Sequence, residues 1–195
     1  VPLVLIGFEA YGNLSVSRLQ GWVTGYKWPV YCFVAVAFWN LVGAGLFGFL
    51  INPPIALYYM QGLNTTAVHG HTALFGVYGM LAIGLMLFCL KAIAPRYVWK
   101  TSVLSFAFWS INIGLALMGV MTLLPIGTLQ LLAAIDHGYW YARSAEFMQQ
   151  PIIDLLVWIR VPGDIIFSFG ALTLAWFVLG LWIRPRFCRR LARGR

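Results

Sequence analysis

The sequence predicts an all-α fold, a polytopic transmembrane helix bundle, and its composition and apolar runs carry that prediction. Hydrophobic residues make up 62% of the 195 positions and charged residues only 9%, which is too apolar for a soluble domain with an ordinary polar surface. Apolar runs near the length of roughly 20 residues that crosses about 30 Å of hydrocarbon recur along the chain. They cover residues 28–51, 67–90, 103–126 and 162–183. We therefore expect four full spans, and helices rather than barrel strands because no alternating pattern of period two is present.

The first fourteen residues form a shorter apolar stretch that predicts a truncated first span. At about 1.5 Å per residue, a helix over residues 1–14 rises only about 21 Å, so we expect the tail end of a longer helix. A short interfacial helix is the alternative. No basic segment precedes the stretch and no small-residue cleavage site follows it, unlike a signal peptide. Because the sequence has no internal repeat or soluble insert, residues 1–195 are expected to form a single transmembrane domain.

Basic residues indicate the orientation of the spans. Eleven of the thirteen Lys and Arg residues fall in three stretches, 18–27, 91–100 and 184–195, which lie on one side of an alternating topology. Since Lys and Arg concentrate in cytoplasmic loops, these stretches, and with them the C-terminus, are expected on the cytoplasmic side. This topology explains the net charge of +8, so the expected partner is the lipid bilayer and not nucleic acid.

His69 and His71 stand at the start of the uncharged apolar run 73–90 and are the first candidates for a functional site. An ionisable side chain in hydrocarbon is costly without a partner, which makes it a functional candidate. Each helical residue advances about 100°, so positions two apart point about 200° away from each other. The spacing therefore predicts two imidazoles that serve two separate sites. The alternative is a pair of core histidines hydrogen-bonded to helix carbonyls or to Ser and Thr hydroxyls.

This divergence favours haem over a compact metal site. A compact site for iron, copper or zinc needs several ligands that converge on one point, whereas haem iron needs few protein ligands because the porphyrin supplies the equatorial ones. We therefore expect two haems, one on each flank of the helix. Gly76, with Thr72 and Ala73, leaves room for a flat ring beside His69, although small residues also serve helix packing in membranes. Bulkier residues follow His71 on its flank: Leu74, Phe75 and Tyr78.

Three motifs that follow one another along the chain resemble those of a known family. They are AVHGHTALFGVYGM at residues 67–80, FWSINIGL at 108–115 and HGYWYARS at 137–144. Together they are similar to the carboxy-terminal part of the large subunit of bacterial nitric oxide reductase, and resemble the quinol-oxidising type more than the cytochrome c-linked one. The resemblance extends over essentially the whole chain. That family is a branch of the haem-copper oxidase superfamily, so the resemblance implies a multi-pass protein of the bacterial inner membrane.

The resemblance implies a separate role for each histidine. By position, His69 corresponds to the axial ligand of the high-spin haem b at the catalytic centre, and His71 to a ligand of the low-spin haem b that transfers electrons. The implied reaction reduces two molecules of nitric oxide to nitrous oxide and water with electrons from quinol, so nitric oxide and quinol are expected partners. Arg160, at the outer interface, is expected to pair with a haem propionate. His137 in the third motif is more typical of a solvated interfacial residue than of a further ligand.

The resemblance also implies components that this sequence does not contain. In the family, a non-haem iron beside the high-spin haem is held by three histidines and a glutamate of earlier helices, and the low-spin haem takes its second histidine from an early helix. We therefore expect a missing amino-terminal half or a partner chain to supply these ligands. Two alternatives stay open: a haem-copper oxygen reductase, which shares the paired histidines, and a non-catalytic haem-carrying or haem-free membrane module.

Overall fold

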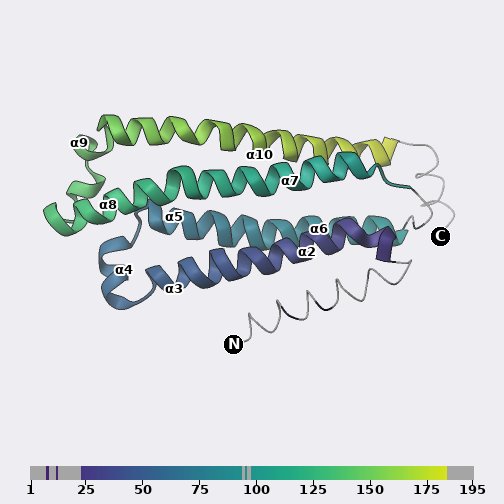
Figure 1. Ribbon diagram of the computed structural model, residues 1–195, viewed down its shortest axis with the longest axis horizontal. Helices are drawn as coiled ribbons and strands as arrows, with labels where there is room; N and C mark the ends of the chain where they lie inside the picture. The colour runs from purple at the N-terminus through teal and green to yellow at the C-terminus, as the bar shows by residue number, and fades with distance from the viewer. Residues whose placement is uncertain (1–7, 9–11, 13–22, 94, 96–97, 184–195) are drawn as a thin grey trace.

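Four helical rods run side by side in the computed structural model, which describes residues 8, 12, 23–93, 95 and 98–183 (Figure 1). This described part of the chain is helical and contains no strand. Each rod is long and apolar enough to cross a membrane, and the candidate spans are Lys27–Ile51, Asn64–Ile93, Thr101–His137 and Pro151–Leu181. The predicted all-α transmembrane bundle with four full spans is confirmed. The truncated span expected at residues 1–14 lies, apart from two isolated positions, outside the described residues.

Each rod consists of one or more helical segments. The first rod contains η1 (Val23–Tyr26), α2 (Lys27–Trp39), η2 (Asn40–Phe47) and α3 (Gly48–Ile51), and the second contains α5 (Asn64–Gly70), η3 (His71–Gly79) and α6 (Met80–Ile93). The third contains α7 (Thr101–Leu117), η4 (Met118–Leu123) and α8 (Leu124–His137), and the fourth is α10 (Pro151–Ile183). Short helices α4 (Pro54–Met60), η5 (Tyr141–Arg143) and α9 (Ala145–Met148) lie in the connections at one end. We call this end the α4 end.

The rods form a row in the order of the sequence (Figure 1). The first rod packs on the second through α2, α6, η2 and η3, and the second packs on the third mainly through α5 and α8. The fourth rod, α10, packs along α7 and η4. The third rod has the most buried apolar window, at 44%, and α10 at the edge of the row has the least buried, at 17%.

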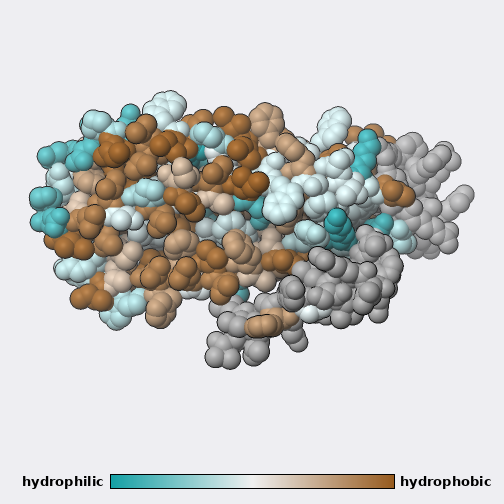
Figure 2. Space-filling view, viewed as in Figure 1, coloured by the Kyte–Doolittle hydropathy of each residue, from teal (hydrophilic) through white to brown (hydrophobic). Residues whose placement is uncertain are grey.

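The outward faces of the rods are apolar. Phe49, Leu74 and Trp176 are examples of large side chains that are mostly exposed, and Figure 2 shows hydrophobic residues across the middle of one face, with hydrophilic residues at the α8–α9 end. Such a surface suits lipid or further transmembrane helices. The third rod, at 37 residues, is about 55 Å long. It therefore extends beyond a hydrocarbon layer of about 30 Å.

Among the described residues, several prolines lie at the starts of helices, whereas Pro125 and Pro162 lie within continuous helical rods. Pro53 and Pro54 follow α3, and Pro54 opens α4 at a first-turn position where its missing N–H is not needed. Pro151 opens α10 in the same way. Pro162, a residue type that commonly kinks a helix, lies inside α10, and the helix continues through it from Pro151 to Ile183.

The first three rods each contain a π-helical segment, and these segments meet at one level. A methyl group at Gly43 of η2 would lie 2.6 Å from the backbone of Thr72 in η3, and one at Gly119 of η4 would lie 3.8 Å from the Thr72 methyl group. We call η2, η3 and η4 together the π-helical layer. Segments with i→i+5 bonding are rare and are frequently found at functional sites. This layer begins next to His69 and includes His71.

Candidate functional site

His69 lies near the end of α5, half-buried, with one edge of its ring against the first rod. Its Nδ1 is 2.8 Å from the carbonyl oxygen of Gly43. Because a carbonyl oxygen only accepts hydrogen bonds, Nδ1 must carry the hydrogen and donate it. A methyl group at Gly48 would lie 3.1 Å from Cε1 of the ring, so the Nδ1–Cε1 edge faces the first rod. In the neutral imidazole the lone pair is then on Nε2, the nitrogen that can bind a metal.

His71 has the same arrangement with a different partner. Its Nδ1 is 2.9 Å from the carbonyl oxygen of Ala67, one turn earlier in its own rod. This nitrogen is therefore also the donor, and the lone pair of the neutral ring is again on Nε2. Within the described part of the chain, neither Nε2 has a hydrogen-bond partner.

These bonds bear on both interpretations of the histidine pair. Hydrogen bonds to helix carbonyls are what the alternative of two core histidines predicts, and the structure contains them. However, each bond uses only Nδ1, and metal-bound histidines nearly always donate their other ring N–H to a carbonyl, carboxylate or water. The arrangement therefore fits an axial ligand with a fixed tautomer and a free Nε2.

The two histidines differ in their surroundings. His69 faces η2 and α3, where Gly43 approaches Thr72 closely. His71 lies on the flank of Leu74 and Tyr78, both of which are 65% exposed. The imidazoles thus meet different parts of the structure, as the spacing of two residues predicts.

Gly76 lies on the His69 flank, one turn beyond Thr72, and is buried. A methyl group there would lie 2.5 Å from Cγ of Trp39 in α2. The indole of Trp39 thus occupies the space beside Gly76 that the sequence predicts for a flat ring. The observed role of Gly76 is to let the first and second rods approach, and a haem contact at this glycine stays a prediction.

Arg160 and Asp164 form an ion pair within α10. Arg160 Nε lies 3.1 Å from each carboxylate oxygen of Asp164, and both side chains are partly exposed. Gly163, between them, packs against Leu117 and Met118. Met118 precedes Gly119, the η4 residue that faces Thr72. Arg160 therefore lies at a depth close to that of the histidine pair. Its two terminal nitrogens have no partner among the described residues, so they remain available to an anionic group.

Gln130 holds the start of the histidine-bearing rod. It is 4% exposed, and its Oε1 accepts hydrogen bonds from the backbone N of Asn64 at 2.8 Å and from Asn64 Nδ2 at 3.0 Å. Its Nε2 donates to the carbonyl oxygen of Ala142 at 3.2 Å. Asn64 is the first residue of α5, where backbone N–H groups lack helical partners. Gln130 satisfies one of them and ties α5 to the connection between α8 and α10.

The third sequence motif joins two connections at the α4 end. Arg143 donates from Nη1 to the Tyr139 hydroxyl at 3.0 Å and from Nη2 to the Gly62 carbonyl at 3.0 Å. Tyr139 donates to the carbonyl oxygen of Gln61. His137 is exposed, with its ring centroid 5.0 Å from that of Tyr141, consistent with the solvated residue that the sequence predicts.

The donor set suits haem better than a compact metal site. The described residues contain no group of three or more His, Cys, Asp or Glu side chains that could hold a metal ion. Two histidines, each with a free Nε2 and a different environment, match the requirement of two irons that need one imidazole each from this side. On this chemistry, His69 and His71 are the residues that would hold the haems.

The fold and the site define a class of protein: a multi-pass helical membrane protein in which one span carries two histidines suited to haem. Comparison with protein families matches residues 1–166 to the family described as Cytochrome C and Quinol oxidase polypeptide I. Since this match covers most of the chain, the chain belongs to that family. It is therefore a membrane subunit of the haem-copper oxidase type, and the family is one of oxidoreductases that bind haem through histidine.

Sequence reasoning did not assign roles to Trp39, Asn112 and Gln130, although the structure places all three in contact with the rods that carry or face the histidines. Trp39 Nε1 donates to Asn112 Oδ1 at 2.8 Å. A signal was present in the sequence, because an amide side chain inside an apolar span needs a hydrogen-bond partner. The sequence alone does not name that partner, since it lies 73 positions away.

Proposed function

We propose that this chain supplies the axial histidines of both haems in a membrane nitric oxide reductase that oxidises quinol. The observation that carries the proposal is the pair of Nδ1–carbonyl bonds, which leaves one metal-binding nitrogen on each of two neighbouring imidazoles. The family match supports a haem-copper oxidase-type subunit. The motifs at residues 67–80, 108–115 and 137–144 favour nitric oxide over oxygen as substrate.

The overall reaction is balanced as two NO, two protons and two electrons giving one N2O and one water. A quinol that becomes a quinone supplies both electrons and releases two protons. When bound, the high-spin haem b on His69 and a non-haem iron with ligands outside this chain supply the redox chemistry, and the low-spin haem b on His71 supplies the electron path.

The residues of this chain orient and surround those groups. The Gly43 carbonyl fixes the tautomer and the ring plane of His69, and the Ala67 carbonyl does the same for His71. Arg160, oriented by Asp164, offers its two terminal nitrogens to a haem propionate. The apolar side chains around the histidines exclude water and keep the local dielectric constant low.

The expected partners follow from the same proposal. They are nitric oxide, quinol, the lipid bilayer of the bacterial inner membrane, and a further segment or partner chain that provides the remaining iron ligands. The basic stretches support a cytoplasmic C-terminus, because Lys27, Lys91 and Lys100 lie at the end opposite the α4 end.

Substitution of each histidine tests the proposal. In the protein purified from membranes with its partner components, His69→Ala is expected to remove the high-spin haem signal and nitric oxide turnover while a low-spin signal remains. His71→Ala is expected to remove the low-spin signal instead. Optical and electron paramagnetic resonance spectra report the haems, and a nitric oxide electrode reports turnover. Retention of both haem signals in both variants contradicts the ligand assignment.

The same preparation separates nitric oxide reduction from oxygen reduction. The matched family includes cytochrome c and quinol oxidases, so oxygen uptake is measured beside nitric oxide uptake with quinol as donor. Rapid oxygen uptake with little nitric oxide turnover identifies an oxygen reductase. Absence of haem even with the partner components present identifies a haem-free module.

A further inference from the structure

The first and second rods fit together in one register, set by three contacts. Trp39 lies on Gly76, Gly43 lies on Thr72, and Gly48 lies beside the ring of His69. Along each rod, the residues that make these three contacts are spaced about one helical turn apart. The two rods run in opposite directions, so the contacts follow one another in matching order. At each contact a glycine provides the space for the residue of the other rod. The register is therefore defined by shape at all three points.

This register decides whether His69 has a partner. The Gly43 carbonyl oxygen and His69 Nδ1 are 2.8 Å apart, and hydrogen bonds of this kind weaken steeply beyond about 3.2 Å. A slide of a single residue along a helix is about 1.5 Å. A shift of that size across the line of the bond lengthens it to about 3.2 Å, the long end of the usual range, and turns the carbonyl away from the N–H, which loosens the hold on the ring.

One hydrogen bond ties the register to the third rod. Trp39 is 5% exposed, and its Nε1 donates to Asn112 Oδ1 at 2.8 Å. Asn112 Nδ2 donates to the Phe108 carbonyl at 2.8 Å and approaches Met80 Sδ at 3.8 Å. The amide orientation is fixed by these partners, because the indole N–H can only donate and the carbonyl can only accept. Asn112 thus connects α7 with the first rod and contacts the start of α6.

An apolar residue at position 112 could fill the same space without placing a half-buried amide inside an apolar span. Buried polar groups cost free energy unless they are hydrogen-bonded, and when all partners are present they specify one arrangement of the elements around them. Asn112 and Trp39 meet this condition, since each polar group of the indole and the amide has a partner. The third rod, the most buried of the four, provides a firm frame for that arrangement.

We propose that Asn112 is a positioning residue for His69: it holds the indole of Trp39 on Gly76 and thereby keeps the Gly43 carbonyl on Nδ1 of the imidazole. The inference rests on the proposed function for the identity of the group at His69 Nε2. The chain of contacts itself, from Asn112 through Trp39 and the first rod to His69, consists of the described residues alone. Asn112 acts through Trp39 and makes no contact of its own with the site.

The test uses three variants and one matched control in the protein purified with its partner components. Trp39→Phe removes the indole N–H while a ring stays on Gly76, Asn112→Leu removes the amide, and the third variant combines both changes. Trp109→Phe is the control, because Trp109 lies on the same α7 helix and is 52% exposed. If Asn112→Leu folds poorly, Trp39→Phe still tests the inference, because the change from tryptophan to phenylalanine removes little volume.

Three measurements report on the haem at His69, and a fourth reports on the imidazole in the haem-free protein. Loss of the hydrogen bond at Nδ1 is expected to lower the affinity of the His69 site for haem by about tenfold. The reduction potential of that haem should rise and its iron–imidazole stretching frequency should fall, because a less basic imidazole stabilises ferric iron less. In the haem-free protein, the 15N signal of His69 Nδ1 should move towards that of an imidazole without an acceptor.

The outcomes separate this inference from the proposed function. The single and double variants should show the same change, since both interrupt one chain of contacts, while the haem on His71 and the Trp109→Phe control stay unchanged. An unchanged Nδ1 signal and an unchanged haem on His69, with only a lower melting temperature, overturn the positioning role. A moved Nδ1 signal in a protein that never binds haem at His69 upholds the positioning role and overturns the proposed function.

Discussion

Around His69 and His71 the first three rods touch through glycines and a threonine in the π-helical layer, whereas from Met80 towards the opposite end the rods are α-helical and pack mainly through large apolar side chains, with close glycine contacts at Gly84 and Gly170. We call the first region the histidine half and the second the apolar half. In the histidine half, hydrogen bonds join rods at defined atoms, for example His69 to Gly43. In the apolar half the rods meet mainly through hydrophobic clusters.

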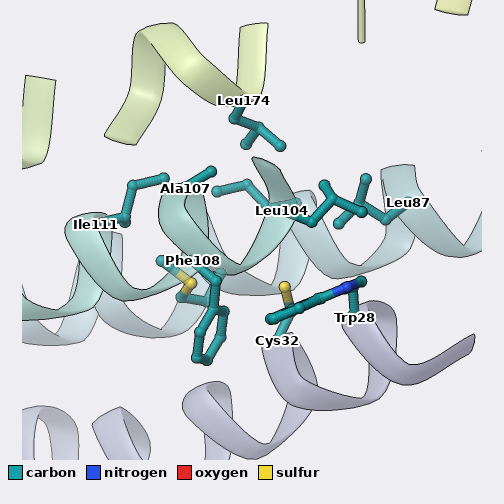
Figure 3. A pocket seen from close by; sticks show the side chains of 10 residues that line it. Trp28, Cys32, Leu87, Leu104, Ala107, Phe108, Ile111 and Leu174 are labelled. Atoms are coloured by element: carbon teal, nitrogen blue, oxygen red, sulfur yellow. The ribbon is translucent and has the colours of Figure 1, made fainter. Parts of the chain in front are cut away.

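The apolar half is closely packed around one small cavity (Figure 3). Trp28 and Cys32 reach it from α2, and Leu174 points into it from α10. The remaining lining residues are Met80, Ile83, Leu87, Leu104, Ala107, Phe108 and Ile111. The cavity has a volume of about 10 Å³, close to the minimum for a single water, and apolar cavities stay dry. This cavity therefore has no room for a ligand larger than a water molecule, and the residues around it stabilise the bundle by packing.

The difference indicates a division of tasks between the halves. Contacts through bulky side chains tolerate small shifts, because side chains can repack. Contacts in which a glycine backbone meets another backbone do not tolerate them, because no rotamer change relieves the overlap. In the histidine half, the close contacts hold the Gly43 carbonyl at a fixed position relative to the His69 imidazole. In the apolar half, side-chain packing holds the rods together.

The largest expected effect is that of Gly43→Ala. The added methyl group would lie 2.6 Å from the Thr72 backbone, so the rods must separate, and the free energy of unfolding should fall by about 3 kcal/mol. The haem signal of His69 should weaken as well. Gly180→Ala in α10, where nothing lies within 4 Å, is the control in detergent unfolding and spectroscopy. If Gly43→Ala and Gly180→Ala have the same free energy of unfolding and the same haem spectrum, close packing in the π-helical layer is not important for stability or for the site.

Leu87→Ala addresses the apolar half. Leu87 is 2% exposed and lines the cavity, so its truncation should lower the free energy of unfolding by about 2 kcal/mol. The haem spectra should stay as in the unmodified protein, because Leu87 is distant from the histidines along the rod. Leu85→Ala, at a position that is 49% exposed on the same helix, should change stability little. A changed His69 spectrum in Leu87→Ala shows that the halves are coupled.

Gln130→Leu is expected to act at the α4 end of the histidine half. It leaves the backbone N–H of Asn64 and the carbonyl of Ala142 without their partner, which should cost about 1.5 kcal/mol. Hydrogen exchange of the Asn64 amide should accelerate before global unfolding does. Thr128→Val serves as the control, since Thr128 is exposed and bonds only to Leu124 of its own helix. Unaltered exchange at Asn64 means that Gln130 does not hold α5.

The smallest effect distinguishes two tryptophans of α2. Trp28 Nε1 is buried without a hydrogen-bond partner within the described part of the chain, whereas Trp39 Nε1 is bonded to Asn112. Trp28→Phe removes an unsatisfied donor and some ring area, so the free energy of unfolding should change by less than about 1 kcal/mol. Trp39→Phe should lower it by more. Thermal unfolding of both variants side by side measures the difference, and the reverse order contradicts the comparison of the halves.

The sequence predicted the bundle because each span reports its own length and hydropathy. The four apolar runs lie within the four observed spans or overlap them, and the histidine spacing predicted that His69 and His71 meet different surroundings. The π-helical layer was not predicted, because hydrophobicity does not distinguish i→i+5 from i→i+4 bonding. The assignment of haems to the histidines and of a propionate to Arg160 stays a prediction.

The partners of individual residues could not be predicted for a physical reason. Gly76 signals only that something approaches the helix closely, and its place on the His69 flank predicts a porphyrin where the structure has Trp39. Likewise, Asn112 and Gln130 signal a need for hydrogen bonds, but the identity of the donor or acceptor depends on how distant rods align. That alignment is a property of the whole bundle, and single spans do not encode it in their local pattern.

The π-helical segment η3 also affects how the length of this chain can change. Because η3 has i→i+5 bonding, the loss of one residue between positions 73 and 78 can be absorbed by a local change to i→i+4 bonding. The loss of one residue from the α-helical part, between positions 81 and 86, instead turns everything beyond it by about 100° and shortens the rod by about 1.5 Å, so that the buried Leu87 rotates out of the core. Insertions and deletions over generations should therefore accumulate in connections such as residues 138–144 and spare α6.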